Sequence, residues 1–313
     1  MSLLARVVRA TGIRNRILSP RLLEKWEQSP RQPYRGAPPF WLARRIRARR
    51  DEREGWPVYE VEARKPERQG RGPVVFLHGG AYVREFDPFM HWRAVAGLAE
   101  MLGRPVVVPI YPLAPEHSHR DAFPFLVALY RRLLAAHAPS EIALVGDSAG
   151  GGLALALCHV LREAGLPQPS DAVLLSPWLD LALANPAIPE VDARDPVLNA
   201  AHARECGRRW ADGAPLDDPK LSPVHVPLRG LARVTVFTGT LDILNPDARV
   251  LRERAREDGV EIGWLEEHGQ LHDWMLSVGG AARRAFREIG RVLARGSSAL
   301  GGVLDASGVS RVS

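Results

Sequence analysis

Cysteine is scarce in this sequence, with only Cys158 and Cys206 among 313 residues. The two lie far apart and form no Cys-x-x-Cys pair, which argues against a disulfide framework and favours free thiols in a reducing compartment. Long hydrophobic runs are also missing. No stretch approaches the roughly 20 apolar residues of a membrane span, and the N-terminus lacks the continuous apolar region of a secretory signal. We therefore expect a globular, cytoplasmic protein.

Lysine is nearly absent as well, occurring only at Lys25, Lys65 and Lys220, so arginine carries almost all of the positive charge. The net charge of +6 is unevenly placed, because residues 1–53 hold fourteen Arg/Lys and four Asp/Glu, a balance of +10 that leaves −4 for the remainder. A basic segment can contact an anionic membrane surface, but a solvated helical face is the simpler interpretation, and we favour it. Nothing resembles a nucleic-acid motif.

Short, continuous apolar runs alternate with helical patterns from residue 58 onward. We predict strands at 58–63, 74–77, 106–110, 142–145, 172–176, 234–238 and 260–265, and helices at 91–102, 123–136, 151–163, 247–258 and 281–294. Strands that are apolar throughout and alternate with helices are typical of a mostly parallel sheet covered on both faces. The sequence therefore predicts an α/β protein.

Three segments depart from this alternation. Residues 1–55 precede it and are predicted to form helices: one at the start of the chain, one from Pro20 to Glu27, and a third that begins near Phe40 and ends before Gly55. Residues 177–231 are proline-rich yet apolar, and they are too long for an ordinary connection, which favours a lid or binding excursion. The Gly/Ser-rich tail, residues 296–313, is expected to be disordered. The main domain then spans 56–295.

Residues 146–150 have the sequence Gly-Asp-Ser-Ala-Gly, between a predicted strand and a predicted helix. This is the context of a nucleophile elbow, in which small neighbours let the strand and helix approach closely and a strained turn exposes the serine hydroxyl. Ser148 is the candidate nucleophile. The alternative is a glycine-rich turn in which Ser148 only caps the helix, and this stretch alone does not decide between the two.

A serine nucleophile needs a base and a carboxylate that orients the base. Asp242 follows the predicted strand 234–238, and His272 follows the predicted strand 260–265, which gives the order Ser, Asp, His expected for a hydrolase sheet of this kind. Asp247 is a rival acid, but it lies in the following helix and is the better candidate for a cap. His268 is a rival base, but the glycine-hinged loop places His272 farther along.

An oxyanion needs backbone amides that point at it before the reaction begins. The amide of Ala149, directly after the serine, is one candidate donor, and the loop at residues 78–81 is the other source. The alternative for that loop is a tight turn between strand and helix. His117 and His119 could suggest a metal, but no third ligand falls at a persuasive spacing. We predict neither a metal nor a cofactor.

Three segments together resemble the hormone-sensitive-lipase family of α/β-hydrolase esterases. They are His-Gly-Gly-Ala at 78–81, Tyr-Pro-Leu-Ala-Pro-Glu-His at 111–117 and Gly-Asp-Ser-Ala-Gly-Gly at 146–151, with further similarity at 176–178, 218–223 and 239–244. The resemblance covers roughly residues 55–292. It implies an α/β-hydrolase fold with a helical cap built from the N-terminal helices and residues 177–231. It also implies Ser148 as nucleophile, Asp242 as acid and His272 as base.

The resemblance further implies that Gly80 and Ala81 donate to the oxyanion alongside Ala149, while Gly79 allows the turn. One departure concerns Ala81, because family members commonly have a third glycine there. The methyl group of alanine narrows the permitted backbone and the adjacent acyl space. The sequence therefore does not determine the exact positions of the amides that would donate to the oxyanion.

The resemblance implies a cofactor-independent esterase for short- to medium-chain carboxylic esters that works through an acyl-enzyme. An amidase, deacetylase or lactonase with the same triad is the enzymatic alternative, and the sequence does not separate these. A hydrolase-fold receptor that has lost catalysis is the non-enzymatic one; such proteins tend to lack the base, whereas His272 is in place. Homodimers are common in the family, but no interface can be derived from the sequence.

Overall fold

A single mixed sheet forms the centre of the computed structural model, which describes residues 3–15, 19–29 and 31–294. Within these residues the sheet has eight strands in the order β1-β2-β4-β3-β5-β6-β7-β8. The strands are β1 (Ile46–Arg53), β2 (Trp56–Ala63), β3 (Val74–Leu77), β4 (Val106–Pro109), β5 (Ala143–Asp147), β6 (Asp171–Leu175), β7 (Arg233–Gly239) and β8 (Gly263–Glu267). The tail expected to be disordered lies outside the described residues.

The six strands from β4 to β8 in this order pair in parallel, whereas β1 and β2 form an antiparallel hairpin and β2 runs antiparallel to β4. Every residue of β3, β4, β5 and β6 is buried. Such central parallel strands need apolar side chains on both faces, because helices cover both. The predicted α/β class and mostly parallel sheet are confirmed.

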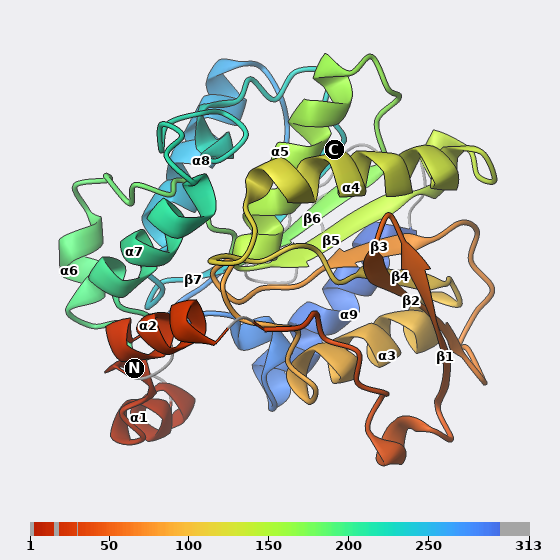
Figure 1. The fold of residues 1–313 in the computed structure, drawn as a ribbon, viewed down its shortest axis with the longest axis horizontal. Helices are drawn as coiled ribbons and strands as arrows, with labels where there is room; N and C mark the ends of the chain where they lie inside the picture. The colour runs from red at the N-terminus through yellow and green to blue at the C-terminus, as the bar shows by residue number, and fades with distance from the viewer. Residues whose placement is uncertain (1–2, 16–18, 30, 295–313) are drawn as a thin grey trace, which may run out of the picture.

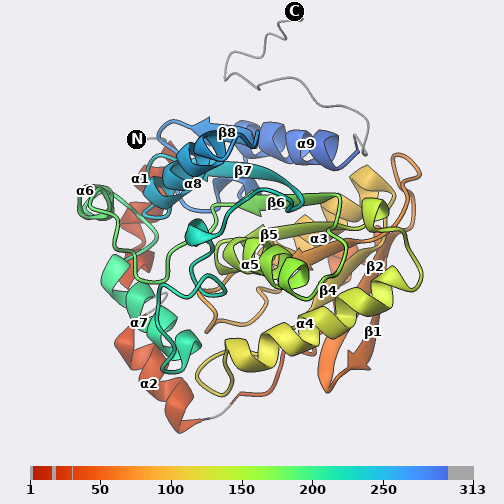
Figure 2. The ribbon, with the colours of Figure 1, turned by 90° about the horizontal axis from the view of Figure 1, so that it is seen from above.

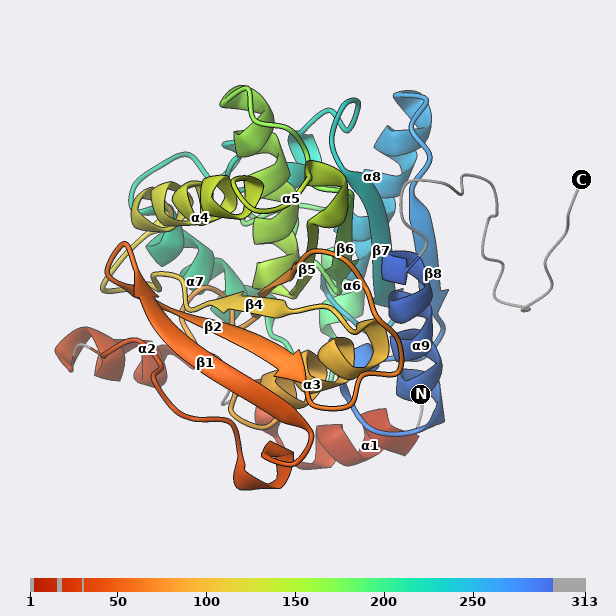
Figure 3. The ribbon, with the colours of Figure 1, turned by 90° about the vertical axis from the view of Figure 1, so that its right-hand side faces the viewer.

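Helices cover the two faces of this sheet (Figures 1 and 3). One face carries α4 (His119–Leu134), α5 (Ala149–Glu163) and α8 (Asn245–Glu257), and the other carries α3 (Met90–Leu102) and α9 (Gly280–Ala294). Each face has its own hydrophobic cluster. The helix α4 begins with a capping box between Ser118 and Asp121, which satisfies amides at its first turn.

A third group of helices gathers at one end of the molecule (Figure 2). It consists of α1 (Leu3–Ala10), α2 (Pro20–Gln28), α6 (Ile188–Asp192) and α7 (Ala200–Ala211). Arg14 ties the N-terminal segment to this group, since its guanidinium donates to the carbonyl of Asp195 at 2.9 Å and to Asp192 Oδ1 at 2.8 Å. Leu23 of α2 is fully buried in the cluster shared with α4 and α5. The N-terminal segment is thus packed against the residues of the 177–231 excursion.

The third helix predicted before Gly55 is wrong. Only a short 3₁₀ turn forms at Phe40–Leu42, and Ile46–Arg53 is the edge strand β1 of the sheet. The strand pairs with β2 through a two-residue turn in which Glu54 and Gly55 both have positive φ, of 48° and 83°. This is the turn geometry that suits the twist of a hairpin. The sheet therefore begins about ten residues before the predicted boundary of the main domain.

Both cysteine thiols are free and buried, Cys158 in α5 and Cys206 in α7. Burial raises the pKa of each thiol to about 12. Protonated, shielded thiols are poor nucleophiles, so these two side chains belong to the packing of the molecule. No helix in the described ranges is both long enough and apolar enough to cross a membrane.

Candidate active site

Ser148 stands at the sharp turn between β5 and α5, with φ 53° and ψ −120°. Only glycines allow this turn. A Cβ on Gly146 would lie 2.1 Å from the carbonyl oxygen of Gly150, and a Cβ on Gly150 would lie 2.0 Å from that of Leu77. A non-glycine residue at positive φ costs on the order of 1–3 kcal/mol and is found where the surrounding structure enforces it. The turn is the elbow predicted from residues 146–150.

Ser148, His272 and Asp242 form one hydrogen-bonded line. Nε2 of His272 lies 3.0 Å from Oγ of Ser148, and Nδ1 lies 2.9 Å from Oδ2 of Asp242. All three side chains are buried, and Oδ1 of Asp242 accepts the amide of Leu244 at 3.0 Å. Because an ionised carboxylate can only accept, Nδ1 carries its proton and Nε2 can face the serine as a base.

The charge around His272 favours its protonated form. Burial lowers the pKa of His272, but the carboxylates of Asp242 and Asp273 outweigh burial and hold that pKa well above its ordinary value. Asp273 is the next residue in the chain, and its Oδ2 lies 3.1 Å from Nε2 of His272. The imidazole therefore touches a carboxylate on each of its two nitrogens. Nothing in the sequence patterns pointed to Asp273.

The loop after β3 lies directly against the elbow. A Cβ on Gly79 would come within 2.3 Å of Oδ2 of Asp147 and 3.0 Å of Cβ of Ser148. The carbonyl of Gly80 accepts the amides of Val83 at 3.1 Å and Arg84 at 2.8 Å, which closes the turn. The loop therefore contacts the elbow through Gly79, and the roles of the Gly80 and Ala81 amides stay predictions.

Ala81 adopts a left-handed backbone with φ 54°, and Tyr82 follows with φ 61°. This is the conformation for which glycine is the usual residue, so alanine adopts this turn at a cost of about 1–2 kcal/mol. The side chain of Ala81 is buried. Compared with a glycine at this position, Ala81 therefore keeps the turn and adds a methyl group to the buried surface beside the elbow.

A second buried Asp–His pair contacts the elbow through Asp147, the residue before Ser148. Nε2 of His91, on α3, lies 3.2 Å from Oδ2 of Asp147, and Nδ1 of His91 accepts the amide of Asp87 at 2.8 Å. Burial lowers the pKa of His91, but Asp147 outweighs it and raises that pKa. Asp147 also accepts a hydrogen bond from the amide of Gly79. The pair links α3, the elbow and the loop after β3, and no sequence pattern indicated it because α3 is remote in the chain.

Aromatic side chains join the 177–231 excursion to this region. Tyr82 stacks on Trp210 of α7 with ring centroids 4.5 Å apart and planes 7° apart, and the ring centroid of Trp178 lies 5.8 Å from that of Tyr82. The amide of Trp178 donates to the carbonyl of Ser148 at 2.9 Å. Tryptophan and tyrosine rings exclude water over a large area. The rings of Trp178 and Trp210 are themselves fully buried, so they join the 177–231 excursion to the hydrophobic core next to the elbow.

A sequence profile described as the alpha/beta hydrolase fold matches residues 74–276. The chain belongs to the α/β-hydrolase fold family. It is 35% identical to an acetyl-hydrolase of Streptomyces hygroscopicus, over 73% of this chain and 77% of that protein. It is 34% identical to the esterase LipU of Mycobacterium tuberculosis, over 71% and 77%. A solved esterase from the bacterial hormone-sensitive lipase family superimposes with a TM-score of 0.79 and 29% identity, covering 94% of this chain and 98% of the other.

These similarities confirm the resemblance to the hormone-sensitive-lipase family of α/β-hydrolases. The matched residues 74–276 include Ser148, Asp242 and His272, together with the loop after β3. The roles of these side chains in catalysis stay predictions. What the α/β-hydrolase fold supplies here is the geometry: a serine, an imidazole and a carboxylate from three loops that meet at one edge of the sheet.

The rival residues lie elsewhere in this α/β-hydrolase. Asp247 is in the first turn of α8 and accepts Nδ2 of Asn185 at 3.0 Å, and burial raises its pKa to about 7. His268 is exposed. Nδ1 of His117 lies 3.8 Å from Asp121, and that of His119 lies 3.1 Å from the carbonyl of Trp210. Over residues 3–15, 19–29 and 31–294, no three His, Cys, Asp or Glu side chains are grouped to hold a metal.

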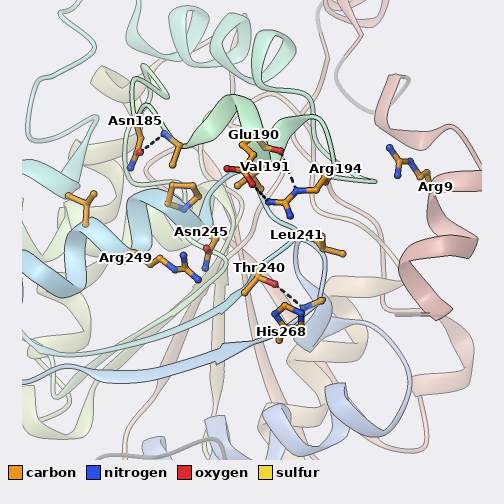
Figure 4. Close-up of a pocket in the computed structure, with 14 residues that line it drawn as sticks. Arg9, Asn185, Glu190, Val191, Arg194, Thr240, Leu241, Asn245, Arg249 and His268 are labelled. Atoms are coloured by element: carbon orange, nitrogen blue, oxygen red, sulfur yellow. Dashed lines mark hydrogen bonds and ion pairs between the residues drawn. The ribbon is translucent and has the colours of Figure 1, made fainter. Parts of the chain in front are cut away.

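A cavity of about 720 Å³ lies beside residues 240–246, the segment that contains Asp242 (Figure 4). Leu241, next to Asp242, and His268 are among its lining residues. Arg9, Arg194 and Arg249 also line it, and the last two pair with Glu190 and Glu266. Ser148 and His272 do not line this cavity, so it is separate from the line of three side chains.

Proposed function

We propose that this protein is a serine carboxylesterase in which Ser148, His272 and Asp242 carry out hydrolysis through an acyl-enzyme. The single observation that carries the proposal is the unbroken line from Asp242 through both nitrogens of His272 to Ser148 Oγ, at 2.9 and 3.0 Å. The names of the relatives, an acetyl-hydrolase and an esterase, support a small carboxylic ester as substrate.

In the first half of the reaction, Oγ of Ser148 attacks the ester carbonyl while Nε2 of His272 takes the hydroxyl proton. The amides of Gly80, Ala81 and Ala149 donate hydrogen bonds that stabilise the negative charge developing on the carbonyl oxygen. Collapse of the tetrahedral intermediate breaks the bond to the alcohol, and the imidazolium gives its proton to the departing oxygen. An acyl group is then bound to Ser148.

In the second half, His272 takes a proton from water, which attacks the acyl carbonyl. The carboxylic acid leaves as Ser148 regains its proton from His272. Asp242 keeps Nδ1 protonated throughout and stabilises the imidazolium. Esters of short- to medium-chain acids are the substrates that the resemblance to the family implies.

The test is hydrolysis of a series of p-nitrophenyl esters by the wild type and Ser148→Ala. We expect the substitution to lower kcat by roughly four to six orders of magnitude without changing the fold, because the nucleophile is lost. Ser170→Ala is the matched control, since Ser170 Oγ donates to the carbonyl of Ile142 at 3.0 Å, away from the elbow. Wild-type rates in Ser148→Ala would reject the mechanism.

An anilide and a lactone series run alongside separates the esterase from an amidase, deacetylase or lactonase with the same triad. A fluorophosphonate probe covers the remaining alternative, a receptor without catalysis. We expect the probe to label Ser148 in the wild type. Absence of both labelling and turnover would favour the receptor.

A further inference from the structure

Asp273 competes with the serine for one nitrogen of the predicted base. Its Oδ2 lies 3.1 Å from Nε2 of His272, while Oγ of Ser148 lies 3.0 Å from the same atom. The backbone enforces this position: Asp273 has φ 53°, and its amide donates to Oγ of Ser176 at 3.1 Å. The carboxylate does not cap the 3₁₀ turn Trp274–Leu276 that follows. Its contact with His272 is therefore the feature that needs an explanation.

We propose that Asp273 sets the lower pH limit of the reaction by holding a proton on Nε2 of His272. The inference rests on the proposed function, because it concerns the same base. With a proton on Nε2, the imidazolium is bound between two carboxylates and cannot accept the proton of Ser148. The base becomes available only when the pH is high enough to remove that proton. Asp273 is thus a positioning residue that acts through His272.

The charges that face this contact come from several elements. Asp242 lies on the loop after β7, with Asp195 of the excursion behind it, Asp147 ends β5, and His91 lies on α3. Burial raises the pKa of Asp273 to about 6, with Asp147 and Asp242 adding to the rise while His272 opposes it. Above that pH Asp273 is mostly an anion, and an anion beside an imidazole raises the pKa of the imidazole.

The surroundings of the second carboxylate oxygen of Asp273 also favour a charged pair with His272. In the described part of the chain, Oδ1 of Asp273 is buried without a hydrogen-bond partner. A buried, half-satisfied carboxylate is costly unless an opposite charge compensates it. The imidazolium of His272 is the compensating charge within contact, so the protonated pair is favoured until the pH rises.

The test is the pH dependence of Ser148 labelling by a fluorophosphonate and of kcat/KM for p-nitrophenyl acetate, in the wild type and Asp273→Asn. Asparagine keeps the shape and tolerates the left-handed backbone, so only the charge is removed. We expect the midpoint of the acidic limb to fall by about one to three pH units. At pH values well below both midpoints the variant is then faster, by about tenfold for each pH unit that the midpoint moves. At high pH the two rates converge.

Glu190→Gln is the matched control, because Glu190 is an exposed carboxylate of α6 that pairs with Arg194. It should leave the midpoint in place. If Asp273→Asn does not fold, Asp273→Gly replaces it, since glycine also accepts φ 53°. An unchanged midpoint in a folded variant overturns the inference while leaving the esterase proposal intact. Loss of turnover and labelling in the wild type would instead remove the esterase proposal.

Discussion

Single atoms decide which residues this elbow tolerates. Gly150 lies within the first turn of α5, where alanine would normally be the better helix former by about 1 kcal/mol. Its missing side chain nevertheless leaves room for the carbonyl of Leu77, 2.0 Å from where a Cβ would lie. Gly290 in α9 offers a contrast, because its Cβ would meet the sulfur of Met101 at 2.2 Å. A backbone carbonyl in a buried strand cannot move away, whereas a methionine side chain can.

We therefore predict opposite outcomes for two helix glycines. Gly150→Ala should destabilise the protein by more than about 2 kcal/mol and lower the rate, because the elbow must shift away from the loop after β3. Gly290→Ala should be close to neutral, since Met101 adopts another rotamer and the helix gains propensity. Thermal denaturation of both variants, with esterase assays at saturating substrate, measures the difference. Equal losses of stability would contradict the argument from backbone rigidity.

At the residue level, the sequence was informative where chain order alone implies proximity. Ser148, Asp242 and His272 each follow a predicted strand, and the carboxyl ends of parallel strands share one edge of a sheet. Asp273 could not be found in this way, because the position of its carboxylate depends on its left-handed φ. An aspartate can adopt that φ, but its presence in the sequence does not predict it. His91 was missed for another reason: it contacts Asp147 across 56 positions, and a lone histidine on a helix has no pattern.

One side chain connects elements that lie far apart in the sequence. The guanidinium of Arg31, between α2 and β1, forms a bidentate pair with Glu116 at 3.0 and 2.7 Å. It also donates to the carbonyls of Ala114, at 2.6 Å, and Val83, and it lies over the ring of Trp26. Arg31 therefore connects the N-terminal segment to the loop after β4 and to the turn that begins at Gly79.

We predict that Arg31→Ala destabilises the protein by about 2–4 kcal/mol, because Glu116 and two carbonyls lose their donor in a site with little water. Arg31→Lys should recover only part of this, since an ammonium cannot form the fork. Urea denaturation measures both, and Arg21→Ala on the exposed side of α2 is the control. If Arg31→Ala lost no more free energy of unfolding than the control, the contacts of Arg31 would not be needed for stability.

The same pair gives a pH dependence with a definite sign. Burial raises the pKa of Glu116, but the hydrogen bonds from Arg31 outweigh burial and lower it. A carboxyl whose pKa is lower in the folded state stabilises the fold fully above its ordinary pKa, and this contribution is lost as the pH falls through the lowered value. The difference in free energy of unfolding between the wild type and Arg31→Ala should therefore become smaller at acidic pH.

Whole elements were predictable where the apolar pattern was strong. The buried strands β3 to β7 and the helices α3, α4, α5, α8 and α9 lie within a few residues of the predicted ranges. The strand β1 was not found, because its side chains are mostly charged and exposed. Edge strands carry charge on both faces, which removes the alternation that marks a strand and also discourages pairing between molecules. The two-residue turn at Glu54 and Gly55 was the signal that could have identified it.

Taken as a whole, the molecule is held by two hydrophobic clusters, one on each face of the sheet. The first contains Leu23 of the N-terminal segment and Trp210 of the 177–231 excursion together with side chains of α4 and α5. The second contains Leu42, just before β1, with side chains of α3 and α9. Neither cluster separates the cap from the sheet. The proposed division into cap segments and a main domain is therefore one of chain order and function, with a shared core.

A shared core predicts cooperative unfolding. We expect one calorimetric transition for the full chain, with a calorimetric enthalpy close to the van't Hoff value, because cap and sheet cannot lose their contacts separately. Leu23→Ala should lower the midpoint of that same transition, since truncating a fully buried leucine costs about 2–5 kcal/mol. Val7→Ala on the exposed side of α1 is the control and should change little. Two resolved transitions, with only the first shifted by Leu23→Ala, would mean that the cap unfolds as an independent unit.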